Sequence, residues 1–559
     1  MSAVLNPCQA FETATVAASG VAVWLYAHHH ACRGDHAFLC YTVACIILYA
    51  TAVACGAEKP LSLSASIFVM HSVSALGSTA CYRLSPWHPL AGFPGPVLSR
   101  ISSLHLVYIS LMGKRYLVID DLHRRFGPFV RIGPDQLSIN LHSANGIIYG
   151  PANHMEKADS YTTPGQIKAT ALFFKQKTKA IHQERKRIWS SAFTRSSINN
   201  FIPAVERRTL ELLDCIEYRQ SESKEQLVDL SKVFCHWAYD IMGEIVFGGS
   251  NNLELMKNGD PAGLVDSGKM ATVLLDSLGQ SPWVIDLAWH LPLGNSMVRL
   301  RQVAAEMMRN RVRADADTTM RDLTSHLLDG RTSSGDAIPL ADLELEAVVA
   351  IQGGSDNTST TLSLAFYYML VSPHNYYSKL RQEIYQAFPE QERDSPLDWD
   401  VLAGLPFLNA VVNEALRLAS PYYLPRNVPP GGVIIDGTFV PEGTSLAIAA
   451  YSQQTSPENF YPDPLDFRVE RWLPGGLGPG SRTEKAALYS FSSGPHVCIA
   501  RSFAYQEMRC ALARIVLSYN FKLVPNFDAK KYRDGILNMR TTLLKEPLLV
   551  RASRTNRVI

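Results

Sequence analysis

The sequence has almost no excess charge of either sign, and this absence argues against several classes of protein. Its 559 residues include 53 Lys and Arg against 51 Asp and Glu, a formal net charge of +2 at pH 7. Proteins that bind nucleic acid through its phosphates need a basic surface, so we expect no nucleic-acid partner. A hydrophobic fraction of 47% with 9% aromatics can build a large core, which excludes wholesale disorder.

Cysteine is scarce over most of the chain. Six of the ten cysteines precede residue 82, inside or beside apolar runs, and only Cys215, Cys235, Cys498 and Cys510 are spread over the remainder. This distribution is not a disulfide framework, and no Cys-x-x-Cys pair indicates a zinc site. We therefore expect the main body to be reduced and cytosolic.

Two well-known catalytic motifs are missing. The glycine run at 475–480 lacks the Gly-x-Gly-x-x-Gly spacing of dinucleotide-binding domains and any strand and helix around it. The Gly-x-Ser-x-Gly elbow of membrane-bound lipases is absent as well. The chain is therefore not expected to carry its own flavin or nicotinamide domain.

Lys and Arg are absent before Arg33, which argues against a cleaved signal peptide because such a peptide needs a basic n-region. Residues 37–57 carry no charge and have the length of roughly 20 residues that a membrane-spanning helix needs. Residues 13–27 are shorter and form a second expected span. Residues 61–82 are the weakest candidate, because they are rich in serine and include His71; a buried core helix is the alternative.

Positive charges favour the cytoplasmic side of a membrane, and this rule gives a consistent orientation. It places the N-terminus, which has no Lys or Arg, outside, with Arg33 and Arg83 inside, so that the main domain faces the cytosol. We expect this to be the endoplasmic reticulum membrane. The triplet at 28–30 (His28, His29, His30) is expected to lie in a solvated loop, because no partner ligands occur at metal spacing.

Four prolines follow Arg83 and are expected to form a stiff hinge, since each fixes φ and opposes helix in the residue before it. No low-complexity linker or repeat follows. We therefore expect three parts: a membrane anchor at 1–83 with one to three spans, a proline-rich hinge at 84–100, and one catalytic domain at 101–559.

Hydrophobic spacing in the catalytic part is mainly helical. The apolar residues recur at i, i+3 and i+4 through five segments, at 203–217, 295–315, 340–370, 376–387 and 405–419. A short strand-like stretch with turn residues lies at 433–450. The expected fold class is mainly α with small β-sheets, preceded by transmembrane segments.

One cysteine lies in a sequence suited to binding a metal. Phe491, Gly494, His496, Cys498 and Ala500 form the spaced residues of FSSGPHVCIA, followed by a run that can form a helix. A thiolate that ligates iron needs a rigid loop whose backbone N–H groups are directed at the sulfur. A glycine allows such a loop to turn tightly. A lone cysteine would more often be a buried core thiol, so the surrounding residues decide.

This loop resembles the Phe-x-x-Gly-x-Arg-x-Cys-x-Gly signature of the cytochrome P450 family, with His496 in place of the arginine and Ala500 in place of the last glycine. The resemblance implies heme b as cofactor, with Cys498 as the axial ligand of its iron. It also implies that Phe491 and Gly494 shape the heme loop. His496 would be a shorter, pH-sensitive substitute for the arginine that meets a heme propionate.

Further segments resemble other motifs of the family in the correct order. Glu414 and Arg417 match its Glu-x-x-Arg pair, and Arg471 matches the arginine that joins them in a buried network behind the heme. We expect these three residues to be structural.

Two more segments resemble heme-propionate contacts. Arg426 lies in LPRNVP, where the family sends an arginine to a propionate. The stretch HQERKRIWSSAF resembles a helix of the family; His182 matches, and Lys186 and Arg187 occupy the positions of its arginine pair. The resemblance assigns His182 and Lys186 to cofactor binding, although a solvated basic face is the alternative for this stretch alone.

The segment 340–370 includes two adjacent glycines, Gly353 and Gly354, which cost a helix about 1 kcal/mol each against alanine. Such a cost indicates that something approaches the backbone closely. The residues that follow resemble the family's oxygen-activating pattern, in which Asp356 and Thr358 match and Asn357 stands where a threonine is usual. The resemblance implies that these three residues are catalytic.

The implied activity is that of a heme-thiolate monooxygenase. It would insert one oxygen atom from O2 into an apolar small-molecule substrate, with electrons from NADPH through a separate NADPH–cytochrome P450 reductase. The hinge, the spans and the wording of the motifs resemble filamentous-fungal enzymes of secondary metabolism. Two alternatives stay open: a heme-thiolate enzyme that rearranges or dehydrates an oxygenated substrate, which Asn357 favours, and a heme-binding sensor without turnover.

Overall fold

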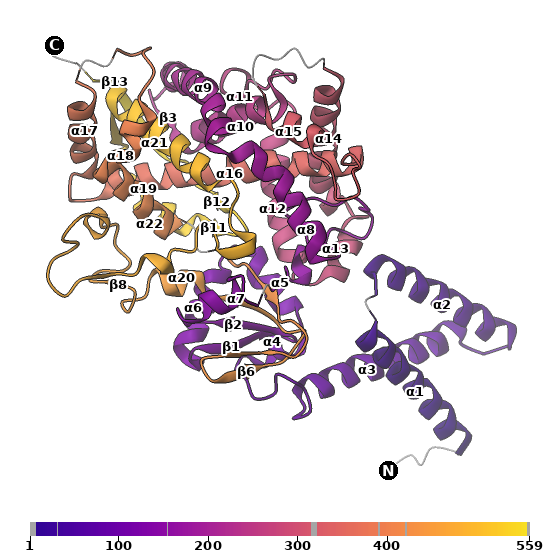
Figure 1. Ribbon diagram of the computed structural model, residues 1–559. Coiled ribbons are helices and arrows are strands. Elements are labelled where there is room, and N and C mark those ends of the chain that lie inside the picture. The colour runs from indigo at the N-terminus through magenta and orange to yellow at the C-terminus, as the bar shows by residue number, and fades with distance from the viewer. Residues whose placement is uncertain are drawn as a thin grey trace.

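The protein consists of a helical N-terminal part that projects from a large, mainly helical body (Figure 1). The computed structural model describes residues 7–30, 32–153, 155–314, 321–389, 392–419 and 422–555. The mainly α class with small sheets is confirmed, and the helices expected from hydrophobic spacing occur at all five segments. Their bounds are α9 (Arg195–Glu222), α14 (Asn295–Arg313), α16 (Leu340–Val371), α17 (Tyr376–Ala387) and α19 (Pro406–Ala419).

Three long helices form the projecting part: α1 (Pro7–His29), α2 (Gly34–Ala54) and α3 (Pro60–Leu84). Of the described helices, α2 and α3 are long and apolar enough to cross a membrane, and both are almost wholly exposed. The helix at 61–82 is therefore not a buried core helix, and α1, which was expected to be the better span, does not meet the same test. Two apolar helices near the N-terminus indicate a membrane anchor.

Polar groups of α3 are satisfied by its neighbours, which explains how a serine-rich helix can still be a span. The His71 imidazole lies 2.8 Å from Ser19 Oγ of α1 and 3.2 Å from the Tyr41 hydroxyl of α2. Ser74 donates to the Ala17 carbonyl at 2.7 Å. His28 and His29 end α1 rather than lying in a loop, because the helix continues to the point where it meets the end of α3.

The remaining helices build the body. They are α4 (Val97–Ile101), α5 (Leu104–Leu111), α6 (Arg115–Phe126), α7 (Ala144–Ile148), α8 (Lys179–Ser190), α10 (Leu230–Phe247), α11 (Leu255–Asn258), α12 (Leu264–Leu278), α13 (Pro282–Ala288), α15 (Leu323–Asp329), α18 (Trp399–Gly404), α20 (Ala450–Gln454), α21 (Arg501–Ser518) and α22 (Ala529–Asp534). Short 3-10 turns include η1 (Asp159–Tyr161), η2 (Ser191–Phe193), η3 (Pro292–Gly294), η4 (Val469–Trp472), η5 (Lys485–Ala487) and η6 (Gly494–His496).

The strands form several small sheets. The largest has the order β1-β2-β7-β4, in which β7 runs parallel to β2 and antiparallel to β4. Its members are β1 (Phe129–Gly133), β2 (Gln136–Ile139), β7 (Ser445–Ile448) and β4 (Arg426–Asn427). The other strands are β3 (Val228–Asp229), β5 (Val433–Ile435), β6 (Thr438–Val440), β8 (Phe460–Tyr461), β9 (Arg482–Thr483), β10 (Tyr519–Leu523), β11 (Ile536–Asn538), β12 (Thr542–Leu544) and β13 (Leu549–Arg554). The stretch at 433–450 therefore contains three strands, as expected, and β4 positions Arg426 at the sheet edge.

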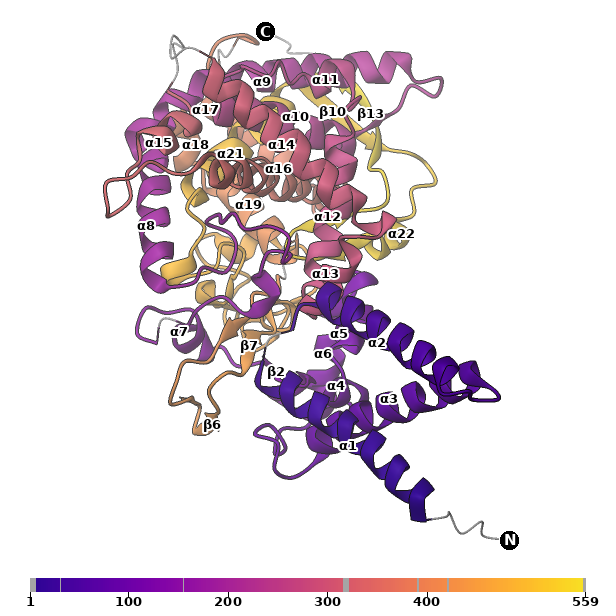
Figure 2. The ribbon, with the colours of Figure 1, turned by 90° about the vertical axis from the view of Figure 1, so that its right-hand side faces the viewer.

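Helix α16 runs through the centre of the body, surrounded by other helices (Figure 2). It packs against α10, α14 and α19, and most of its residues are buried. A helix buried on all sides is apolar around most of its circumference, so the polar residues that α16 does carry must have specific partners.

A buried carboxylate joins α19 to the turn η4. The Glu414 carboxylate accepts hydrogen bonds from Nε and Nη2 of Arg417, at 2.8 and 2.7 Å, and from Nε of Arg471 at 3.3 Å. The Trp472 indole also donates to it, at 2.9 Å. These charges are buried together, and the network has the geometry expected of a structural ion cluster.

We predict that Glu414→Gln will strongly destabilise the body. The amide leaves two buried guanidinium groups without a counter-charge, and breaking a buried pair in this way costs about 3–5 kcal/mol. The free energy of unfolding in denaturant would measure this loss. Asp534→Asn, which removes the exposed ion pair with Lys530, is the matched control and should leave stability unchanged; equal behaviour of the two variants would contradict the structural role of Glu414.

Candidate functional site

A mostly apolar cavity of about 310 Å³ lies in the body between α16 and the loop that precedes α21. Its wall includes Val349, Ala350 and Gly353 on α16, and Pro495 and Cys498 on the loop. Segments far apart in sequence therefore meet around one enclosed space, as is typical of a binding site for a small molecule or cofactor.

Cys498 lies on the wall of this cavity at the end of a tight loop. Its backbone N–H donates to the Phe491 carbonyl at 2.9 Å, which closes the loop. Gly494 has φ +63, and a Cβ there would come within 1.9 Å of the Tyr149 carbonyl oxygen, so glycine is required by both conformation and space. The Phe491 ring also faces the cavity and packs on Tyr505.

The charge state of Cys498 is set by opposing effects. Burial among protein atoms raises the pKa of the thiol, while the Ala500 N–H and the positive charges of Arg501 and Lys186 lower it. The side chain is nevertheless accessible from the cavity. A thiolate at this position would therefore need a cation on the cavity side, which a metal ion supplies.

His182 and His496, predicted separately, lie in direct contact. Nδ1 of His496 is 3.1 Å from Nε2 of His182, and the rings are 4.3 Å apart. Lys186, one turn further along α8, donates to the Pro495 carbonyl at 2.6 Å, and burial lowers its pKa. Helix α8 and the cysteine loop are thus joined by side chains that also line the cavity.

Arg426 is buried, and its guanidinium lies in the same cavity wall. Its Nη1 donates to the Pro425 carbonyl at 3.0 Å, and the group lies over the ring of Tyr149 at 5.3 Å. Its Nε is buried and has no hydrogen-bond partner among the described residues. An unsatisfied buried donor beside an enclosed cavity indicates that a bound acceptor completes the site.

These observations fit heme. A flat porphyrin needs apolar walls, a thiolate on one face and cationic donors for its two propionates. Cys498, Arg426, Lys186 and the histidine pair all line the cavity, so a bound heme would find a sulfur ligand for its iron and cationic donors for its carboxylates there.

The three residues predicted to be catalytic on α16 are divided between two sides of the helix. Asn357 and Thr358 line the apolar cavity. Asp356 instead lines a second, polar cavity of about 450 Å³ on the far side, bounded by α10, α12 and the β12 region. The sequence placed these residues in a row but did not reveal that they face different spaces.

Asp356 and Asn357 each have a tyrosine partner that sequence reasoning missed. The Tyr239 hydroxyl of α10 donates to Oδ1 of Asp356 at 3.1 Å, and Oδ2 is buried with no partner in the part of the chain that the structure describes. Burial raises the pKa of Asp356 to about 6, although the bond from Tyr239 lowers it. The Tyr422 hydroxyl donates to Oδ1 of Asn357 at 2.9 Å, so the amide NH2 is the group directed to donate to a ligand. No motif contains either tyrosine, and only the fold identifies them.

The adjacent glycines of α16 have different neighbours. A Cβ on Gly354 would lie 2.4 Å from Sδ of Met242 on α10, whereas a Cβ on Gly353 would meet no atom within 4 Å. The close approach expected from the sequence is therefore made by α10 at Gly354. Gly353 leaves open space in the cavity wall.

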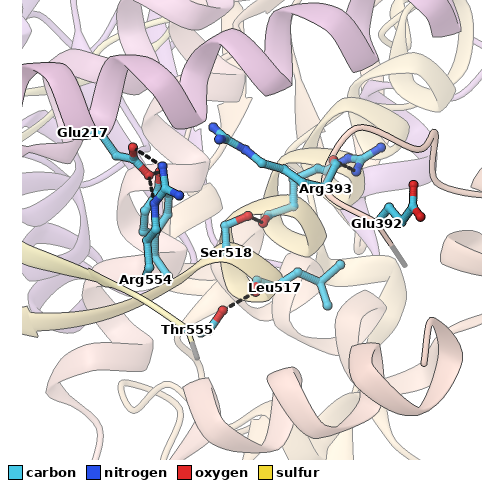
Figure 3. Close-up of a pocket in the computed structure, with 9 residues that line it drawn as sticks. Glu217, Glu392, Arg393, Leu517, Ser518, Arg554 and Thr555 are labelled. Carbon is cyan, nitrogen blue, oxygen red and sulfur yellow. Dashed lines mark hydrogen bonds and ion pairs between the residues drawn. The ribbon is translucent and has the colours of Figure 1, made fainter. Parts of the chain in front are cut away.

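A further cleft, lined by Glu217, Arg393 and Arg554, lies away from this site (Figure 3). Its polar residues pair with one another, as Arg554 does with Glu217 and as Thr555 does with the Leu517 carbonyl. Such mutual pairing is typical of a structural contact.

Comparison with known proteins agrees with the site. The family model for cytochrome P450 matches residues 94–545. Similar curated proteins include cytochrome P450 67 of Uromyces fabae, 29% identical over 84% of this chain and 87% of that protein. Tryprostatin B 6-hydroxylase of Neosartorya fischeri is 28% identical over 84% and 83%, respectively. Cytochrome P450 monooxygenase prhB of Penicillium brasilianum is 30% identical over 78% and 88%. The matched region includes every residue of the heme cavity, and the chain belongs to the cytochrome P450 family of heme-dependent oxidoreductases.

Proposed function

We propose that this protein is a heme-thiolate monooxygenase that inserts one atom of O2 into an apolar small molecule and reduces the other to water. The single observation that carries the proposal is the placement of Cys498 and the Asn357 region of α16 around one apolar cavity. The relatives named as monooxygenases support the same reaction class. Heme bound at Cys498 would supply the oxygen chemistry.

The protein's own residues would hold the cofactor and supply protons. Cys498 would ligate the iron, and Arg426, Lys186, His182 and His496 would hold the propionates. Asn357 would donate a hydrogen bond into the cavity, and Thr358 would form the adjacent polar wall.

Asp356 would deliver protons from solvent. It faces the polar cavity, where Lys269, Asp260 and Asp266 also lie, and it is one residue from Asn357 on the apolar side. A carboxyl group with a pKa of about 6 can gain and lose a proton near neutral pH. A turn of its side chain or an ordered water would carry the proton around α16.

Electrons would come from NADPH through a separate NADPH–cytochrome P450 reductase, because the chain has no dinucleotide-binding motif. The division into anchor (1–83), hinge (84–100) and catalytic domain (101–559) is part of this proposal. Arg33 and Arg83 both lie at helix ends that contact the body, which supports a cytosolic body on the endoplasmic reticulum membrane.

The substrate class follows from the relatives. One relative, from Neosartorya fischeri, is named for the 6-hydroxylation of tryprostatin B, and other relatives come from Penicillium and Aspergillus species. These relatives, together with the mostly apolar wall of the cavity, support a role in fungal secondary metabolism. The rearrangement enzyme keeps one specific observation in its favour, namely Asn357 in place of a threonine.

We predict that Cys498→Ser will abolish the red-shifted Soret band of the reduced carbonyl complex. Only a thiolate opposite CO produces that band, and an alcohol is a far weaker donor. Cys510→Ser is the control: this thiol is buried on α21 beside Glu206 and should not affect the band. Persistence of the band in Cys498→Ser would exclude Cys498 as the ligand.

We predict that Asp356→Ala will lower product formation by roughly 100-fold or more, the usual contribution of a positioned acid. Because the pKa of Asp356 is about 6, activity of the unmodified protein should fall as pH rises through that value and the acid loses its proton. Tyr239→Phe removes a bond that favours the carboxylate, so it should shift this fall to higher pH.

The control for this experiment is Asn357→Thr, which restores the usual residue and should be tolerated or improve the coupling of NADPH oxidation to product. If Asp356→Ala kept full turnover and product formed without NADPH, the rearrangement enzyme would be the better account. A protein that binds heme and CO but yields no product with any reductase would instead indicate a sensor.

We predict that a chain lacking residues 1–83 will still bind heme but sediment less with membranes. Both candidate spans precede this cut and every residue of the heme cavity follows it. The measurements are heme content and membrane sedimentation of the purified body. Loss of heme from well-folded truncated protein would contradict the proposed division.

A further inference from the structure

The turn between the first two anchor helices is docked on the catalytic body. Figures 1 and 2 both show α2 starting beside α13 and then running away from the body. Arg33, just before α2, donates through Nη1 to the Gly165 carbonyl at 2.9 Å and through Nη2 to Asp35 at 2.6 Å. A guanidinium can make both contacts because its donors form a planar fork.

Asp286 of α13 joins the same turn from the other side. Its carboxylate accepts the Gly165 N–H at 2.8 Å and the Gly34 N–H at 3.3 Å. Gln166 completes the contact, since its Nε2 lies 3.0 Å from Asp35 Oδ2 and 3.1 Å from the Asp286 carbonyl. Three segments that are more than 100 residues apart in sequence are therefore bonded together at one point.

The fit is tight as well as polar. A Cβ on Gly34 would lie 1.9 Å from the Trp283 carbonyl oxygen, so only glycine allows the α2 start to reach α13. Here the backbone of α2 packs directly against the backbone of α13, and such a contact forms only when both helices have a fixed position. The turn at 33–35 is therefore built to dock and is not an incidental surface contact.

The docked segment of the body continues directly into the wall of the heme cavity. Tyr161, Leu172 and Phe173 line that cavity, on either side of Gly165 and Gln166. Phe173 is also 36% exposed, so the wall reaches the protein surface there. The far end of this segment is held to α16, because the Leu172 N–H donates to Glu346 at 3.0 Å.

The α12–α13 region is held against the same wall. Asp276 near the end of α12 pairs with Arg115 at 2.9 Å and with Arg540 at 3.4 Å. The Arg540 guanidinium lies 4.1 Å from the centre of the Tyr161 ring. The segment at 161–173 thus forms a cover over the cavity that α13 holds from the outside through Asp286, and the anchor turn bonds to the outer edge of this cover.

We propose that Arg33, Gly34 and Asp35 are positioning residues that hold this cover in its closed position, so that the membrane anchor sets how readily apolar ligands enter the heme cavity. The inference deepens the proposed function and rests on it for the identity of the cavity. An apolar substrate dissolved in the bilayer would reach the protein on the side where the anchor helices meet the cover.

Hydrogen–deuterium exchange on the full chain in lipid nanodiscs tests the docking without reference to heme. Arg33→Ala should increase amide exchange in peptides covering 162–168 and 282–290 by roughly tenfold, the effect expected when a charge-assisted hydrogen bond is lost. Asp286→Ala should increase exchange in the same peptides. It leaves the charges of the anchor intact, which matters because Arg33 also helps to set the orientation of the helices in the membrane. Arg33→Lys should restore part of the protection.

The control is Lys59→Ala, in the exposed turn between α2 and α3 at the far end of the anchor. It should leave exchange in both peptides unchanged. Unchanged exchange in both Arg33→Ala and Asp286→Ala would overturn the docking role.

Ligand entry is tested in the same variants with 4-phenylimidazole as the probe, followed by the shift of the heme absorption band. Association and dissociation should both become severalfold faster in Arg33→Ala and Asp286→Ala, while the carbonyl spectrum stays that of the unmodified protein. Increased exchange with unchanged association rates would overturn the role in entry. Absence of a thiolate-type carbonyl spectrum in the unmodified protein would contradict the proposed function instead, and the exchange result would stand apart from it.

Discussion

The burial of α16 is the constraint on which the rest of the structure depends. The helix separates an apolar cavity from a polar one, and each side of it is completed by different elements. Because a buried helix exposes no face to water, its polar residues must point to partners or into cavities. Asp356 and Asn357 are adjacent in sequence, but burial raises the pKa of Asp356, whereas Asn357 lines the apolar cavity and accepts a hydrogen bond from Tyr422.

The cysteine loop depends on the same packing. Gly494 brings the loop against the Tyr149 carbonyl, and the loop closes through the bond from Cys498 to Phe491. Behind it, the buried pair of Glu414 with Arg417 and Arg471 holds α19 to η4, and the buried pair of Arg514 with Glu206 holds α21 to α9. A ligand on the cavity side therefore meets a rigid sulfur, because the backbone that carries it has little freedom to move.

The anchor is connected to the body more closely than a flexible tether would be. The proline-containing segment at 84–100 packs on the body, where the Arg131 N–H donates to the Pro94 carbonyl at 2.7 Å. The turn before α2 makes a second connection at Gly165. Two attachment points fix the orientation of α1–α3 relative to the cavity cover. A single attachment point would leave these helices free to rotate about it.

The sequence by itself determined the family-like motifs, the helices with regular apolar spacing and the cysteine that faces the cavity. These features are local, because a motif or a helical spacing of apolar residues lies within a short stretch of consecutive residues. Only the tertiary structure decided that His182 contacts His496 and that Asp356 faces away from the heme cavity. It alone also identified the hydrogen bonds from Tyr239 to Asp356 and from Tyr422 to Asn357. It also reversed the order of α1 and α3 as candidate spans, because α3 is an exposed helix of 25 residues with the length and hydropathy of a span, whereas α1 does not meet this test. Such contacts join residues far apart in the chain, and their geometry follows from packing that no local pattern encodes.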